Sequence, residues 1–241
     1  MKKLFKAIRQ GDLHEVIAIL AKNPEAISSI AIPPPKKDIG QSPLQVAVKT
    51  EQFEIAYYLM EQGADVDFME AQAEGVTMWM PILHDAIRTV FSSLCYKNIE
   101  NSKKMLELTE ELLKRGADPN KQAFNTFAAL DECVARANSI LDNQGAYPTV
   151  QDITEKQLTA VLDLLLKYGA DFNEWANHGH YAGEGETNRE LFLDEFKAQS
   201  DTVQTVTLRG RTTTSVIKGD EDRTAHTRKV MREYCKKHNL L

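Results

Sequence analysis

The chain has 241 residues, of which 42% are hydrophobic and 27% are charged, and its formal net charge is −6. This composition is typical of a globular protein that buries a core. Residues 209–241 carry nine Lys/Arg and four Asp/Glu, so a basic tail follows an acidic body, and the body is a poor candidate for gripping a phosphate backbone.

The beginning of the chain and its cysteines indicate the compartment. The segment MKKLFKAIRQGD lacks the apolar stretch of a signal peptide, and no run approaches the roughly 18 apolar residues that a membrane span needs. Cys95, Cys133 and Cys235 are far apart and lack Cys-x-x-Cys spacing, which favours reduced, mostly buried thiols. We therefore expect a soluble, cytoplasmic protein that does not associate with membranes.

One short pattern occurs three times, as EQGADVDFME, KRGADPNKQA and KYGADFNEWA. Its glycines, Gly63, Gly116 and Gly169, are separated by equal intervals of 53 residues. Apolar residues stand three, four and eight positions before each glycine, which is the stripe of an amphipathic helix. Glycine ends helices by entering the left-handed conformation without steric cost. Each Gly-Ala-Asp is therefore predicted to end a helix.

A second pattern precedes each of these glycines, in the segments SPLQVAV, PILHDAI and AALDECV. In each, a leucine is followed three positions later by a small residue, as in Leu44 with Ala47, Leu83 with Ala86 and Leu130 with Cys133. A small side chain at that position lets two helices approach closely. The chain is thus predicted to repeat a helix pair.

These openers and closers resemble the ankyrin repeat family, whose unit opens with Thr-Pro-Leu-His-x-Ala and closes with Gly-Ala-Asp. The segment LFKAIRQGDLHEVIAILAKNP resembles an N-terminal capping repeat. The resemblance covers residues 1–175, about four repeats with the first as a cap. It implies an all-α solenoid of helix-turn-helix units, stacked so that each unit buries its faces only against its neighbours. It also implies that His84 ties adjacent turns together through hydrogen bonds.

The chain departs from the family in its period, which is 53 residues instead of about 33. In the first interval we expect an enlarged connecting finger, ADVDFMEAQAEGVTMWM, and an extended pair of helices, PILHDAIRTVFSSLCYKN and NSKKMLELTEELLKR. In the second interval we expect a link, DNQGAYPTVQDITEKQ, with a new helix starting at a capping box from Thr154 to Gln157.

Residues 176–241 are predicted to form a diverged C-terminal capping repeat that carries an insertion. A loop, ANHGHYAGEGETN, precedes a short helix in RELFLDEFKAQ. The Val- and Thr-rich segment TVQTVTLRGRTTTSVI suggests a β-hairpin with its turn near Gly210. The last segment predicts a basic amphipathic helix whose apolar face is Val230, Met231, Tyr234 and Cys235.

Motifs that carry chemistry are few, so we expect a protein without enzymatic activity, metal or cofactor. His178 and His180 lack a third ligand at a recognisable spacing, and no phosphate loop or nucleophile elbow is present. Arg209, Arg211, Lys218 and the basic last helix could contact nucleic acid. Tyr234 is the single aromatic residue there for base stacking, so docking onto the acidic repeats is the preferred interpretation.

Recognition of another protein is the remaining function, and the fingers are the expected site. Trp anchors and flexible Met contacts are enriched at such surfaces. The expected partner-binding residues are Phe68, Met69, Glu70, Glu74, Met78, Trp79, Phe124 and Trp175. A Trp79 buried under its own loop is the opposing interpretation.

The identity of the partner is predicted only by analogy. Bacterial ankyrin proteins of this size resemble immunity proteins that neutralise a toxin, and an acidic concave face would suit a basic one. The alternatives are a scaffold or an effector that binds a host protein, and an enzyme or nucleic-acid binder that uses residues 176–241. The enzyme would require His178, His180 or His226 to converge with a carboxylate.

Overall fold

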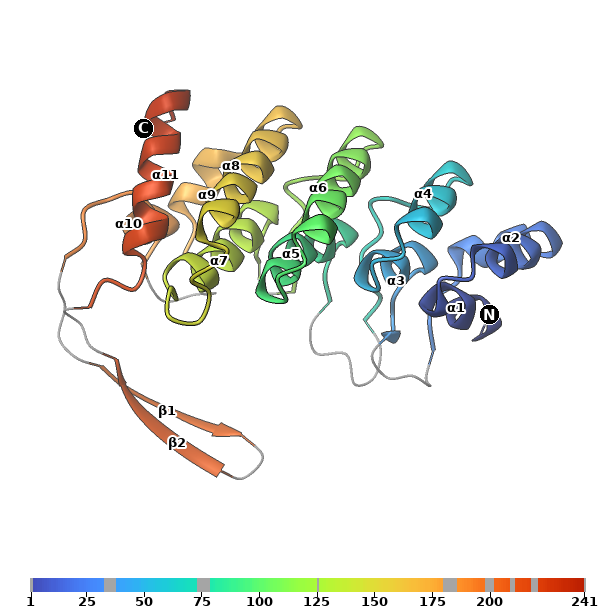
Figure 1. Cartoon of the computed structure of the whole chain (residues 1–241), viewed down its shortest axis with the longest axis horizontal. Coiled ribbons are helices and arrows are strands. Elements are labelled where there is room, and N and C mark those ends of the chain that lie inside the picture. The colour runs from blue at the N-terminus through green and yellow to red at the C-terminus, as the bar shows by residue number, and fades with distance from the viewer. Residues whose placement is uncertain are drawn as a thin grey trace.

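A computed structural model describes residues 2–32, 38–72, 79–124, 126–179, 186–197, 202–208, 211–217 and 221–240. Helix pairs follow one another in a row from the N-terminus to the C-terminus (Figure 1). The four pairs are α1 (Lys2–Gln10) with α2 (Leu13–Lys22), α3 (Pro43–Lys49) with α4 (Phe53–Glu61), α5 (Ile82–Cys95) with α6 (Ile99–Lys114), and α7 (Ala129–Leu141) with α8 (Gln151–Lys167). A short 3-10 helix, η1 (Pro24–Ser28), follows the first pair.

Each helix pair packs against the pairs beside it. The first helices of the pairs, α1, α3, α5 and α7, form an inner row in which each contacts the next, and α2, α4, α6 and α8 form an outer row in the same way. Leu44, Leu83 and Leu130 are buried in this core together with the small residues Ala47, Ala86 and Cys133. The helix pairs are therefore repeats of an all-α unit. They stack closely where the sequence places its small side chains.

The Gly-Ala-Asp glycines end the outer helices, as the sequence predicts. Gly63, Gly116 and Gly169 follow α4, α6 and α8 with φ of +86°, +102° and +93°. After α4, the backbone N–H groups of Gly63 and Ala64 donate to the carbonyls of the last helical turn, at 3.2 and 3.0 Å. This pattern satisfies carbonyl groups that a helix end would otherwise leave unpaired.

Side chains at equivalent positions tie one repeat to the next. The Nε2 atom of His84 lies 3.1 Å from the carbonyl oxygen of Lys121, which confirms the role that the family resemblance implied. In the closers, Asp67 Oδ1 accepts the N–H of Asp118 at 3.0 Å, and Asn120 Oδ1 accepts the N–H of Asp171 at 2.8 Å. Equivalent residues of successive repeats therefore make equivalent hydrogen bonds, in addition to their contacts in the core.

The expected start of a helix at Thr154 is wrong. Helix α8 begins at Gln151, and Thr154 lies buried inside it, where its Oγ1 donates to the carbonyl of Val150 at 2.7 Å. Gln157 is also buried, and its Nε2 donates to Ser102 Oγ of α6 at 3.1 Å. The Thr-x-x-Gln pattern therefore serves packing between outer helices, and the link is shorter than predicted.

The described residues of the last part of the chain form two short helices, a longer final helix and two strands. These are α9 (Phe172–Asn177), α10 (Asn188–Phe192), β1 (Thr202–Leu208), β2 (Arg211–Ile217) and α11 (Ala225–His238). The strands pair in antiparallel register from Thr202 opposite Ile217 to Leu208 opposite Arg211. They extend away from the helical row (Figure 1).

Helix α11 packs against α7 and α10 and buries its apolar face of Val230, Met231, Tyr234 and Cys235. Its N-terminus is capped from another part of the chain. Asp142, just after α7, accepts the N–H groups of His226 and Thr227 at 2.8 and 3.0 Å, and the Thr227 hydroxyl at 2.6 Å. A carboxylate in this position satisfies the unpaired donors of the first helical turn.

Candidate protein-binding face

The connections between pairs, here called the fingers, are joined to one another by backbone hydrogen bonds. Their described parts are residues 29–32 with 38–42, 65–72 with 79–81, and 118–124 with 126–128. The N–H of Gly40 donates to Ala31 within the first finger, and the N–H of Ala71 donates to Gly40 across to the second, at 3.0 and 2.8 Å. The N–H of Phe124 in the third finger donates to Trp79 in the second at 3.0 Å. The fingers thus form one continuous hydrogen-bonded row beside the inner helices.

The residues predicted to bind a partner lie at different depths. Phe68 and Met69 are half-buried, and Phe68 packs against the core. Glu70 is buried. Glu74 and Met78 lie outside the described residues. The remaining three, all aromatic, divide into an accessible pair and a core residue.

Trp79 and Phe124 form an aromatic pair across two fingers. Their ring centroids are 6.0 Å apart with an interplanar angle of 60°, an edge-to-face arrangement. Trp79 is half-buried, and Phe124 retains 37% of its accessible surface. The pair precedes α5 and α7, so it stands where the fingers meet the inner helices.

The expected exposure of Trp175 is wrong, because the residue is 2% exposed and belongs to the core. The chain after Gly169 forms helix α9, not an open finger, and Asp171 caps it by accepting the N–H of Glu174 at 2.9 Å. Phe172, Trp175 and Ala176 are spaced so that one helical side buries all three. Asp171 before that spacing was the signal in the sequence that could have identified the helix.

One acidic side chain of the second finger, Glu70, is buried. Glu70 Oε1 accepts Gln41 Nε2 at 3.1 Å. Burial raises the pKa of Glu70, although the hydrogen bond from Gln41 opposes the shift. The expectation that acidic groups form the outer surface here is therefore wrong at Glu70.

Asp85, on the inner helix α5, is a second buried carboxylate. Its Oδ2 accepts Gln45 Nε2 from α3 at 2.7 Å, and the same Nε2 donates to the carbonyl of Met80 at 3.2 Å. Burial raises the pKa of Asp85, and the opposing attraction of Lys49 and the bond from Gln45 do not cancel it. The ionised form of Asp85 is therefore disfavoured in the folded chain.

We expect Asp85→Asn to stabilise the protein at pH 7, because it removes an ionised group that the fold disfavours. A carboxyl group whose pKa is raised on folding is destabilising above its folded pKa, and has no such effect below its unfolded pKa of 3.8. The gain should therefore shrink as the pH falls and be absent below about pH 3.8. Urea unfolding of both proteins at pH 7 and below about pH 3.8 measures the difference in stability. A gain in stability that is the same at both pH values would contradict the prediction.

A third buried carboxylate holds two arginines. Glu132 Oε1, on α7, accepts Nε of Arg88 on α5 at 2.8 Å and Nε of Arg136 on α7 at 2.7 Å. Burial alone would raise the pKa of Glu132, but the bonds and charges of the two guanidinium groups outweigh it and lower the pKa. The Glu132 side chain is 5% exposed, whereas those of Arg88 and Arg136 are 33% and 43% exposed. The cations are thus outermost.

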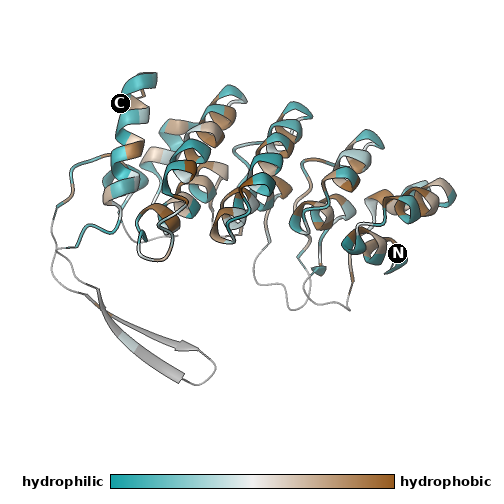
Figure 2. Cartoon of the chain, in the orientation of Figure 1, coloured by the Kyte–Doolittle hydropathy of each residue, from teal (hydrophilic) through white to brown (hydrophobic). Residues whose placement is uncertain are grey.

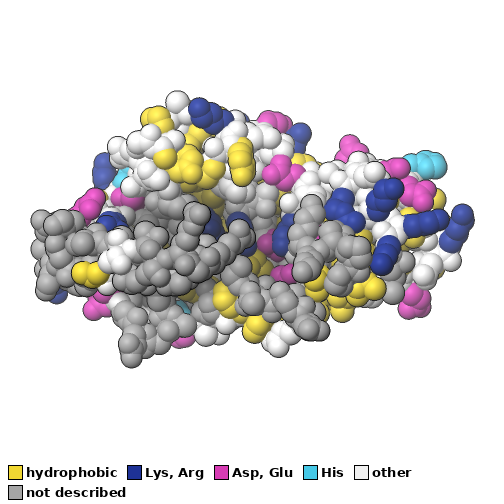
Figure 3. All heavy atoms as spheres, turned by 90° about the horizontal axis from the view of Figure 1, so that it is seen from below, with side chains coloured by type: hydrophobic (Ala, Val, Ile, Leu, Met, Phe, Trp, Pro, Cys, Tyr) yellow, Lys and Arg dark blue, Asp and Glu magenta, His cyan; other side chains and the backbone are white. Residues whose placement is uncertain are grey.

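The face seen from the finger side has mixed character. Basic, acidic and hydrophobic side chains all appear there, between the segments left grey (Figure 3). This mixture differs from the acidic concave face that was expected from the sequence.

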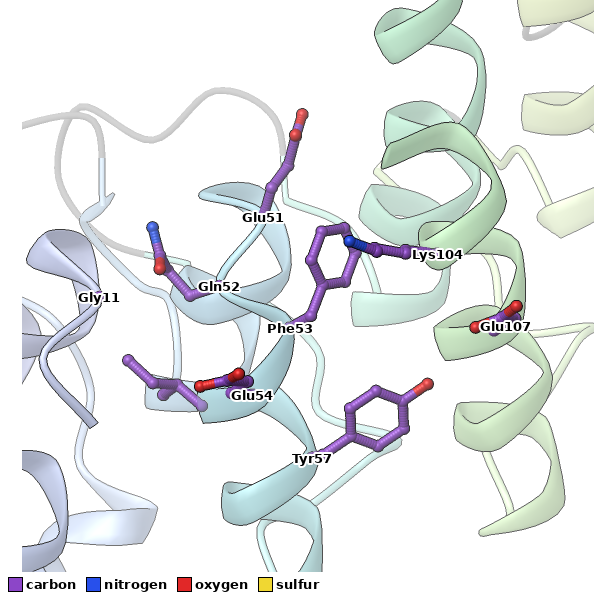
Figure 4. A pocket seen from close by; sticks show the side chains of 9 residues that line it. Gly11, Glu51, Gln52, Phe53, Glu54, Tyr57, Lys104 and Glu107 are labelled. Atoms are coloured by element: carbon purple, nitrogen blue, oxygen red, sulfur yellow. The ribbon is translucent and has the colours of Figure 1, made fainter. Parts of the chain in front are cut away.

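A hollow lies on the outer side of the stack, over α4 and α6. Its volume is about 440 Å³, and its lining residues include Gln52, Tyr57, Lys104 and Glu107 (Figure 4). Glu51 points away from Tyr57 in this view, and its carboxylate bonds to Ser93 Oγ at 3.3 Å and to the Asn101 amide. Its carboxylate therefore ties neighbouring repeats together.

The histidines considered for chemistry make local contacts. His178 Nε2 lies 3.1 Å from Thr126 Oγ1, and His180 lies outside the described residues. His226 Nε2 lies 2.7 Å from Glu155 Oε1 of α8, so His226 does meet a carboxylate as the enzyme alternative requires, and the same contact docks α11. Across the described segments, no three His, Cys, Asp or Glu side chains are grouped so as to hold a metal ion.

The basic residues of the tail divide between contacts within the tail and solvent, and the hydrogen bonds of Arg228 to described residues do not reach the acidic repeats. Arg228 is buried and bonds to Asp222 Oδ1 at 3.1 Å, whereas Lys229, Lys236 and Lys237 are exposed on α11. Arg209 and Lys218 lie outside the described residues, and of Arg211 only the backbone is described.

Comparison with known proteins identifies one repeat directly. The family model described as Ankyrin repeat matches residues 39–70, which cover α3, α4 and the start of the second finger. No curated protein matches the chain. Each described helix mixes hydrophilic and hydrophobic residues (Figure 2), and none of them is long and apolar enough to cross a bilayer.

Proposed function

The chain is an ankyrin repeat protein, and from this premise we propose that it binds a partner protein through its fingers and inner helices. The observation that carries the proposal is the Trp79–Phe124 pair, which is accessible on fingers held in register by backbone hydrogen bonds. Partly exposed aromatic residues on a pre-ordered support are typical anchors of protein interfaces.

Residues 176–241 act in this proposal as the C-terminal cap of the stack. Helix α11 covers α7, and Tyr234 donates from its hydroxyl to Asp163 Oδ1 of α8 at 2.7 Å. A terminal unit of a repeat stack must cover apolar surface that the last repeat would otherwise expose. This role explains the buried face of α11 without requiring a second binding site.

A non-enzymatic role agrees with the family, whose members are generally interaction modules. Within this class we propose an immunity protein, which neutralises a toxin by covering it. A single partner bound in equal amount is the expected signature of that role. A scaffold would instead bind several partners at once.

We expect Trp79→Ala to weaken the affinity for the partner by about 2 kcal/mol, which is the loss typical of an interface hot spot. The partner is first captured from native lysate, identified and purified, and its Kd is then measured by calorimetry. The melting temperature should stay nearly unchanged, because Trp79 is half-buried and stands outside the helical core.

Phe53→Ala is the matched control, because Phe53 is also a half-buried aromatic residue but lies on the outer helix α4. It should leave the affinity unchanged. Equal losses of affinity in the two variants would refute the proposal. A large fall in the melting temperature of Trp79→Ala would show that Trp79 is a core residue.

A further inference from the structure

A basic residue recurs at nearly the same place on each inner helix. Arg9, Lys49 and Arg88 each stand five residues after the leucine that begins the buried pattern, in LFKAIR, LQVAVK and LHDAIR. Arg136 stands six residues after it in LDECVAR. Because α1, α3, α5 and α7 are neighbours in the stack, these four residues lie on successive inner helices, and together they are here called the cationic row.

The arginines of the cationic row form ion pairs with buried carboxylates, and Lys49 acts on two others through its charge. Arg9 forms an ion pair with Asp38, and Arg88 and Arg136 share Glu132. Lys49 attracts Glu70 and Asp85 electrostatically. The four carboxylates concerned are all buried: Asp38, Glu70, Asp85 and Glu132.

The four cations of the row and the four carboxylates are equal in number, but the carboxylates lie deeper than the cations. Lys49 is exposed, and the guanidinium groups of Arg88 and Arg136 remain partly exposed above Glu132. Both arginines use Nε to bind Glu132, and their terminal nitrogens have no hydrogen-bond partner among the residues that the structure describes. Guanidinium groups only donate, so these nitrogens select a ligand that accepts hydrogen bonds.

We propose that the cationic row receives an acidic segment of the partner protein, a deduction that rests on the proposed function. The acidic charge of the body suggested a basic partner, but on this face the anions lie beneath the cations. Packed helices are about 8–10 Å apart, and an extended chain advances about 3.3–3.6 Å per residue. An extended segment with a carboxylate at every third residue would therefore match the row.

The experiment uses two labelled peptides of equal length, one of Glu-Ser-Gly repeats and one of Lys-Ser-Gly repeats, with binding measured by fluorescence anisotropy at low salt. The glutamate peptide should bind the unaltered chain, and the lysine peptide should not. Arg88→Gln combined with Arg136→Gln should weaken binding of the glutamate peptide about tenfold, because charge-assisted bonds to two guanidinium groups are lost. Binding should also weaken as salt is added.

Lys103→Gln combined with Lys104→Gln is the matched control. It changes the net charge equally, but on exposed positions of the outer helix α6, and it should weaken peptide binding less than about twofold. Circular dichroism verifies that each variant folds. If the double variant does not fold, Arg136→Gln alone replaces it, because this variant keeps the bond of Arg88 to Glu132.

Several results would overturn the inference. The first is that the glutamate peptide does not bind. The second is that the arginine and lysine variants lose equal affinity for it. The third is that the lysine peptide binds more tightly than the glutamate peptide. Tighter binding of a single-stranded oligonucleotide, also lost in the arginine variant, would assign the row to phosphate instead. A captured partner that is lost on Trp79→Ala but kept by the arginine variant would overturn the cationic row alone. A partner kept by Trp79→Ala would overturn the proposed function and leave the peptide result standing.

Discussion

Replacing Asp142 with alanine is expected to lower the free energy of unfolding by about 3 kcal/mol, because one carboxylate accepts three hydrogen bonds at the start of α11. Loss of this cap leaves the N–H groups of His226 and Thr227 without their acceptor. The docking of α11 would then depend on its packing and on the remaining contacts of His226 and Tyr234 with α8. Urea unfolding gives the total effect, and hydrogen exchange shows whether α11 opens first.

Two variants make this prediction specific. Asp142→Asn keeps an oxygen acceptor and should cause a smaller loss than alanine, because asparagine is also a good helix cap. Glu61→Ala removes an exposed carboxylate at the end of α4 and should change stability by less than about 0.5 kcal/mol. If Asp142→Ala behaved like Glu61→Ala, the capping contact would have no energetic role.

Gly40→Ala should also cost about 3 kcal/mol, for two physical reasons. Gly40 has φ of +85°, which is unfavourable for residues with a side chain. An added Cβ would also lie 2.4 Å from the carbonyl oxygen of Ala71, a backbone atom of the next finger. The first two fingers would have to separate, so binding of the partner should weaken as well.

Gly63→Ala separates these two reasons. Gly63 has nearly the same φ, +86°, but a Cβ there would meet nothing within 4 Å. Its cost should be about 1 kcal/mol, the effect of the backbone conformation alone. If thermal unfolding showed equal costs for Gly40→Ala and Gly63→Ala, the contact between the fingers would be unimportant.

The sequence predicted the repeated part of the fold well, because the repeat supplies several independent signals in register. Gly63, Gly116 and Gly169 end helices, and leucines paired with small residues mark the closely packed inner helices. His84 was placed by the family resemblance, and its bond to the next finger confirms that role. Such features depend on local spacing, which a sequence displays directly.

Features that depend on depth or on a distant partner were harder to predict. Thr154 and Gln157 fit a capping box, but inside α8 Thr154 donates to the carbonyl of Val150 and Gln157 donates to Ser102 of the neighbouring helix α6. Trp175 stands just after a finger-like closer, yet the helix that Asp171 caps turns it into the core. Spacing alone does not show which member of a charged pair is buried, so the order of Glu132 and Arg136 in depth was missed.

The nearest-neighbour packing of the helix pairs also has a mechanical consequence. In a stack where each unit contacts only adjacent units, small rotations at the interfaces add along the row instead of being resisted by long-range contacts. The curvature of the molecule is then a soft coordinate, and its two ends move farthest relative to each other. A partner that spans several inner helices would select one curvature and hold it. The whole protein would therefore become stiffer when the partner binds.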